Sequence, residues 1–145
     1  MLAESVGRAM ESHRYRLTAF VFMPEHVHLM IYPLPEADTI DALLKAVKRP
    51  FSYRSTQLLI QSRSRLLERL TVHQRPGVTT FRYWQQGPGY DRNFIKPSTV
   101  LDAIDYLHFN PVRRGFVKRA VDWKWARARF YLLNPPRQYA SLPTV

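Results

Sequence analysis

Two histidines at alternate positions, His26 and His28, follow a proline-containing turn and precede an apolar stretch. Residues i and i+2 of a strand point to the same face, so a strand here would direct both imidazoles at one cation. Neutral imidazole is a common metal ligand. Two histidines beside a turn are also compatible with chance or with packing, so this motif alone leaves both interpretations open.

A second pair, Tyr106 and Asn110, is separated by four positions. On a helix these residues lie one above the other, so a phenol and an amide would face the same target. An amide oxygen can complete a nitrogen-and-oxygen site for a hard divalent ion. The alternative is that Tyr106 is a core aromatic residue and Asn110 ends the helix before Pro111.

The composition favours a partner with negative charge. The chain has 145 residues, with 22 Lys and Arg against 11 Asp and Glu, and a net charge of +11. A polyanion, and nucleic acid first, fits this balance. The absence of cysteine excludes disulfides, thiolate metal sites and cysteine nucleophiles. No apolar run resembles a signal peptide or a membrane span, so we expect a cytoplasmic, nucleoid-associated protein without a membrane partner.

Four elements must position the histidine pair. Apolar spacing predicts a short helix over residues 1–12, and aromatic and aliphatic runs predict strands at 15–22 and 27–32. A further helix is expected to begin at Asp38 or Thr39 and to kink or end at Pro50.

The second half of the chain alternates basic, aromatic and turn-forming segments. Helical spacing continues over residues 51–72 and suggests a basic helical arm. The remaining expectations are a loop at 73–78, a short strand at 81–85, a turn at 87–93, and a helix from 97–99 to about 110–111. Residues 1–131 are predicted to form a single domain, followed by a loose proline-containing tail at 132–145.

Taken together and in this order, the motifs resemble the HUH superfamily of single-tyrosine transposases, and most closely its REP-associated tyrosine transposase branch. The matching segments are MPEHVHLMI at 23–31, YWQ at 83–85, GYDRN at 89–93, DYLHFNPVRRGFV at 105–117 and DWKWARAR at 122–129. The histidine strand followed by the tyrosine helix is much more specific than either motif alone.

The resemblance implies an α/β domain of the ferredoxin-like type, with an antiparallel sheet, helices on one face, and the histidine strand facing the tyrosine helix. His26 and His28 match the two metal-binding histidines, and Tyr106 matches the nucleophile. Asn110 stands where relatives place a third polar ligand, and Mg²⁺ or Mn²⁺ would be the cofactor. Relatives usually have an additional strand before the first helix, so we expect a sheet without that strand, which leaves catalytic activity open.

The implied reaction is cleavage and rejoining of single-stranded DNA through a 5′-phosphotyrosine intermediate, on folded-back hairpins of imperfect palindromes. A homodimer is common among related enzymes. Basic residues in two segments are the candidate DNA contacts: Lys45, Lys48, Arg49, Arg113, Arg114, Lys118, Arg119, Lys124, Arg127 and Arg129. A solvated basic face is the alternative for these residues, and core packing is favoured over base stacking for Trp123 and Trp125.

Several alternatives remain at this point. Tyr90 is a second tyrosine in a matching motif, but it lacks a polar partner at helical spacing. A non-catalytic DNA-binding protein derived from such a transposase would bind without forming a covalent product, and an RNA-binding module would prefer RNA. A two-metal carboxylate nuclease is disfavoured, because only Asp102 and Asp105 flank a candidate site. Residues 62–80 are either a DNA-contacting arm or an insertion without function.

Overall fold

The computed structural model describes residues 1–87 and 89–133. Within these limits the chain is organised as two compact units, one made of residues 1–15 and 33–91 and the other of residues 16–32 and 92 onward. The polypeptide therefore passes three times between the units. The single domain expected over residues 1–131 stays a prediction, and the expected tail lies outside the described residues from position 134 onward.

The first unit contains two helices packed against each other, α1 (Leu2–Ser12) and α2 (Ile40–Gln61). Both bury apolar residues at helical spacing, as the sequence predicted. Thr39 is the N-cap of α2, and its hydroxyl accepts a hydrogen bond from the backbone N–H of Ala42. An ion pair of 2.8 Å between Glu4 and Arg54 joins the two helices.

Pro50 does not end α2, which excludes one of the two effects that the sequence predicted for it, an end or a kink. The helix continues for eleven residues beyond it, to Gln61. A proline at this position removes one backbone hydrogen bond. Val47 and Phe51 flank it and are buried, so tertiary packing offsets the loss.

A small hairpin follows α2 where a loop was predicted at residues 73–78. Helix α3 (Leu66–Leu70) leads into strand β3 (Thr71–Arg75), which pairs antiparallel with β4 (Val78–Phe81). Only Pro76 and Gly77 form the turn, and Gly77 has a φ of +76°, as the third residue of a type II turn requires. The strand predicted at 81–85 is also wrong, because β4 ends at its first residue.

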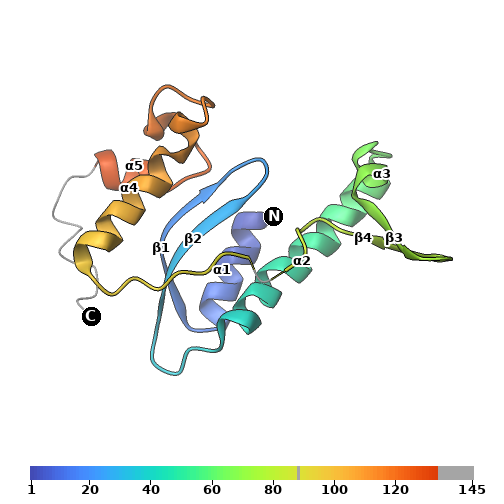
Figure 1. Cartoon of the computed structure of the whole chain (residues 1–145), viewed down its shortest axis with the longest axis horizontal. Helices are drawn as coiled ribbons and strands as arrows, with labels where there is room; N and C mark the ends of the chain where they lie inside the picture. The colour runs from blue at the N-terminus through green and yellow to red at the C-terminus, as the bar shows by residue number, and fades with distance from the viewer. Residues whose placement is uncertain (88, 134–145) are drawn as a thin grey trace. The chain divides into compact units, whose positions relative to one another are not determined.

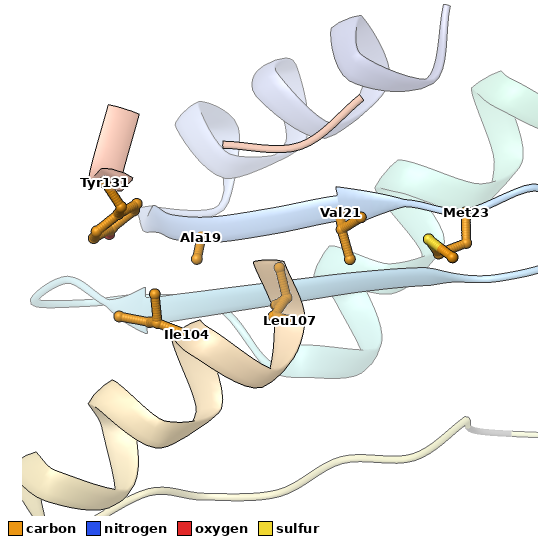
Figure 2. Packing of buried hydrophobic residues seen from close by; sticks show 6 residues of the cluster. All are labelled: Ala19, Val21, Met23, Ile104, Leu107 and Tyr131. Carbon is orange, nitrogen blue, oxygen red and sulfur yellow. The ribbon is translucent and has the colours of Figure 1, made fainter. Parts of the chain in front are cut away.

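The second unit is built on a β-hairpin, β1 (Tyr15–Phe22) and β2 (Val27–Pro33), whose strands match the predicted ones. Helix α4 (Pro97–Arg113) covers it (Figure 1). Ile104 and Leu107 of α4 pack against Ala19, Val21 and other apolar residues of the hairpin (Figure 2). This contact fixes the tyrosine helix against the histidine hairpin.

Helix α4 passes through Pro111 and ends at Arg113, whereas the sequence predicted an end near Asn110. Gly115, with a φ of +73°, provides the actual stop. Its N–H donates to the Val112 carbonyl, and the N–H of Phe116 donates to the Pro111 carbonyl, both at 2.9 Å. These two bonds form a Schellman motif, which satisfies the last carbonyls of the helix.

The outer edge of β1 is covered by a segment from the C-terminal part of the chain. Phe22 N–H donates to the Trp125 carbonyl at 2.9 Å, and Arg127 N–H donates to the Phe20 carbonyl at 3.1 Å. This segment lies between a short 3-10 helix, η1 (Ala120–Asp122), and α5 (Ala128–Leu133). Within the described residues β2 pairs with β1 alone, so its other edge has no strand partner there.

The structure is therefore a mixed α/β fold with small antiparallel sheets, as predicted. No helix among the described residues is both long and apolar enough to cross a membrane.

Candidate active site

The two histidines lie at the start of β2. His28 is the second residue of the strand, and His26 is the last residue of the turn before it. Their ring centroids are 4.7 Å apart, with the ring planes at 79°. The rings are thus close enough to share one small ligand, as alternate positions on a strand predict.

Glu25 connects His26 to the C-terminal end of α4. Its carboxylate lies 3.6 Å from Nδ1 of His26 and accepts a hydrogen bond from the Arg114 guanidinium. A carboxylate at one ring nitrogen orients the imidazole and leaves Nε2 available. The sequence analysis missed this role of Glu25, because its partner Arg114 is 89 positions away and no local pattern links them.

Asn110 is buried on α4 and contacts the histidine strand directly. Its Nδ2 lies 3.1 Å from Nε2 of His28, where it donates a hydrogen bond when His28 carries its proton on Nδ1. Asn110 is a helical residue that packs towards β2 and does not serve as a helix stop. The predicted helix-to-strand juxtaposition is therefore present.

Tyr106 lies one turn before Asn110 on the same helix, and 57% of its surface is exposed. Its ring centroid is 6.5 Å from that of His28. The Arg113 guanidinium lies over the Tyr106 ring, 3.9 Å from its centroid, and also donates to the Tyr106 backbone carbonyl. A cation over a phenol ring attracts its π electrons and restrains the ring. The spacing of seven residues, two helical turns, is the sequence signal for this contact.

The donor chemistry fits a divalent cation. Burial, and secondarily the neighbouring charge of His26, lowers the pKa of His28 below its usual value of 6.5. This keeps His28 in the neutral form that binds metals. No group of three or more His, Asp or Glu residues within the described part of the chain could hold a metal. A third ligand from Asn110 would be its amide oxygen, whereas its amide nitrogen faces Nε2 of His28 in this structure. The amide would therefore have to turn over for Asn110 and His28 to share a cation.

His108 occupies the opposite, buried face of α4. Its ring is fully buried, packs 5.0 Å from the Tyr131 ring, and has no hydrogen-bond partner among the described residues. Burial, together with the charge of Arg127, lowers the pKa of His108 to about 4. His108 is therefore a neutral core residue of the second unit.

The basic residues predicted to contact DNA in the second unit are mostly engaged within the protein. Arg127 donates to the backbone carbonyls of Leu17 and Thr18 at 2.7 and 3.2 Å. Other contacts of this set join Arg129 to the Val121 carbonyl, Arg119 to Asp122, and Lys124 to the Trp125 ring. Lys118 is exposed. Trp123 packs against the core and donates to the Phe22 carbonyl, whereas half of the Trp125 surface is exposed.

The remaining predicted residues belong to the first unit. Lys45 and Arg49 are exposed on α2, and the Lys48 ammonium lies 5.9 Å from the centroid of the Trp84 ring. Tyr90 is 89% exposed in a segment without regular structure. Among the two candidate tyrosines, only Tyr106 lies in the same unit as the histidine pair.

Comparison with known proteins identifies two curated relatives. The chain is 25% identical over 117 residues to a Haemophilus influenzae protein assigned to the REP-associated tyrosine transposases, covering 80% of this chain and 60% of that protein. It is 22% identical over 127 residues to the REP-associated tyrosine transposase of Escherichia coli K12, covering 87% of this chain and 62% of that protein. The chain thus spans about 60% of the length of each relative. No family model matches.

A solved structure shares the fold. The structure of a REP-associated tyrosine transposase bound to a REP hairpin matches with a TM-score of 0.59 and 18% identity, covering 92% of this chain and 66% of that one. This agreement confirms the fold class that the motifs implied. In sequence and in fold, the chain is thus similar to REP-associated tyrosine transposases.

Proposed function

We propose that this chain cleaves and rejoins single-stranded DNA beside a hairpin, with Tyr106 as nucleophile and a divalent metal as cofactor. The observation that carries the proposal is the contact between Asn110 and His28, since it joins the tyrosine helix to the histidine strand at 3.1 Å. The names of the two relatives and of the hairpin-bound structure agree with this activity.

In the proposed step, the phenol oxygen of Tyr106 attacks a backbone phosphorus, and the bond to the 3′ oxygen breaks. The phenol proton leaves, the 3′ oxygen takes up a proton, and the products are a 5′-phosphotyrosine and a free 3′-hydroxyl. One phosphodiester replaces another, so the reverse attack by a 3′-hydroxyl can rejoin strands without an energy source. The Arg113 guanidinium over the ring restrains the phenol beside His28.

His26, His28 and Asn110 would hold Mg²⁺ or Mn²⁺, which when bound supplies positive charge for the phosphate oxygens and for the leaving 3′ oxygen. The protein's own contribution is orientation. Glu25 fixes the His26 ring through Nδ1, and its ion pair with Arg114 ties the turn to the end of α4. The exposed position of Tyr106 leaves its ring accessible to a strand that no complementary strand covers.

The proposal is tested by incubating the protein with labelled hairpin oligonucleotides from the flanks of its gene, in Mn²⁺ or in EDTA. We expect a denaturation-resistant protein–DNA adduct in Mn²⁺ that disappears in EDTA, in Tyr106→Phe and in His26→Ala. Tyr90→Phe is the matched control, since Tyr90 is exposed and lies in the other unit. Tight binding without any adduct would instead support a non-catalytic DNA-binding protein. An adduct that survives Tyr106→Phe would reject Tyr106 as nucleophile.

A further inference from the structure

The segment that follows α2 carries exposed positive charge, most of it in and beside α3 and one arginine on the β3–β4 hairpin. We define the arm as residues 62–80, which contain α3, β3 and most of β4. The arm has one acidic residue, Glu68, and it is exposed. Its four arginines are also exposed: Arg63, Arg65, Arg69 and Arg75. None of the four arginines has a carboxylate partner within 4 Å in the part of the chain that the structure describes. The arm thus presents positive charge that is free to bind an anionic partner molecule.

The base of the arm is held firmly, while its end is not. Arg82 N–H donates to the Leu70 carbonyl at 2.7 Å, and the Thr71 hydroxyl donates to the Leu67 carbonyl at 2.7 Å. The Tyr83 and Trp84 rings pack against the buried Phe51 ring of α2, at centroid distances of 4.7 and 5.5 Å. Figure 1 shows the hairpin extending from the end of α2 where α3 lies. No residue of α3 or β3 is buried.

The chemistry of the arm selects among nucleic acids. Proteins that grip single strands combine positive charge with aromatic rings on which bases stack. Residues 62–80 contain no Phe, Tyr or Trp. Beside the arm, the Tyr83 and Trp84 rings pack against Phe51, and 40% of the Tyr83 surface is exposed. A two-stranded β-ribbon fits the major groove of B-form DNA, and arginines contact its phosphates.

We propose that the arm is a second DNA-binding surface that grips the backbone of duplex DNA, such as the stem of a hairpin. This proposal rests on the proposed function only in one respect, that the hairpin substrate supplies the duplex stem. The site at Tyr106 would act on an unpaired strand, while the arm holds the paired segment. The arm thereby contributes affinity for the paired segment.

The test compares binding of a blunt DNA duplex without unpaired flanks by the whole chain and by Arg63→Ala/Arg65→Ala/Arg69→Ala/Arg75→Ala, using fluorescence anisotropy at several salt concentrations. We expect the dissociation constant to rise at least about tenfold. The slope of log affinity against log salt should become shallower by up to about 3.6, since each of the four lost phosphate contacts removes about 0.9. The matched quadruple Arg→Lys variant keeps the charge and should stay within about threefold of the wild type.

The two proposals fail independently. Adduct formation on an unpaired oligonucleotide without a stem reports on Tyr106, and we expect the arm variants to retain it. Unchanged duplex binding by the quadruple Arg→Ala variant, with retained circular dichroism, would overturn the assignment of the arm. An equal loss of affinity for an unpaired strand would overturn the preference for duplex. Tighter binding of an RNA duplex than of a DNA duplex would overturn the choice of DNA.

Discussion

The second unit and the arm use the same side chain, arginine, in opposite ways. In the second unit, Arg127 donates to two carbonyls of β1 and Arg114 pairs with Glu25 beside the histidines. On the arm, Arg63 and Arg75 are exposed and meet no carboxylate among residues 1–87 and 89–133. Net charge alone would treat both groups as one DNA-binding surface, whereas their contacts separate a structural role from a binding role.

The two regions also differ in how they are stabilised. The second unit has a core shared by the β1–β2 hairpin, α4 and α5 (Figure 2). The arm contributes no residue to the buried core. An isolated two-stranded hairpin is marginally stable in water, so the arm depends on its base contacts. Substitutions in the second unit should therefore change folding, and substitutions on the arm should change binding.

The largest effect is expected in the core of the second unit. Ile104 is 1% exposed and packs against the β1–β2 hairpin, so Ile104→Ala should lower the free energy of unfolding by about 3 kcal/mol. The control on the arm is Val78→Ala. It should lower the free energy of unfolding by less than about 1 kcal/mol, because Val78 is only half-buried. Denaturant unfolding measures both. Equal costs would show that the arm is as tightly packed as the core.

The pH dependence of stability should come mainly from His108, with a contribution of the same sign from His28. The unfolded chain protonates this imidazole near pH 6.5, whereas the folded protein resists protonation until about pH 4. Stability should therefore fall as the pH drops through this window, by about 3 kcal/mol in total. His108→Phe should remove most of this dependence and leave the smaller contribution of His28. An unchanged profile in His108→Phe would reject this cause.

Arg127 gives the most direct comparison of the two groups of arginines. Arg127→Met removes its two hydrogen bonds to β1 and should lower the free energy of unfolding by about 2 kcal/mol. Arg75→Met should leave that free energy within about 0.5 kcal/mol. Thermal unfolding distinguishes the two outcomes, and duplex binding by the folded variants should weaken only for Arg75→Met. A loss of duplex binding in Arg127→Met and a loss of stability in Arg75→Met would reverse the structural and binding roles of these two arginines.

The smallest effect is expected at the tip of the arm. Gly77 has a positive φ, which a side chain disfavours by about 1 kcal/mol, so Gly77→Ala should loosen the turn between β3 and β4. Duplex affinity should fall about threefold while the thermal unfolding midpoint stays unchanged. Gly7→Ala, in α1, is the control, because a Cβ there meets no atom within 4 Å. A lowered midpoint in Gly77→Ala would mean that the arm is part of the folding core.

The local pattern of the sequence was enough to place both pairs of candidate site residues. A run of aromatic and aliphatic residues predicted the strand that carries His28, and four-residue spacing predicted that Tyr106 and Asn110 share a helix face. These predictions succeeded because strand and helix periods are properties of the backbone over a few residues. The order of the motifs further indicated the fold, which the solved relative confirms.

Local signals failed where distant packing competed with them. Proline predicted helix ends near positions 50 and 111, but buried neighbours carry α2 through Pro50, and Gly115 sets the end of α4 instead. The β3–β4 hairpin was read as a loop because Pro76 and Gly77 dominate a short segment.

By itself, the sequence determined the residue types of the site, their placement on a strand and a helix, and the excess of positive charge. The tertiary structure alone decided that Asn110 contacts His28, that Glu25 pairs with Arg114, and which arginines remain without a partner. The physical reason is separation along the chain. Asn110 and His28 are 82 positions apart, and such contacts depend on how whole elements pack, which no local periodicity encodes.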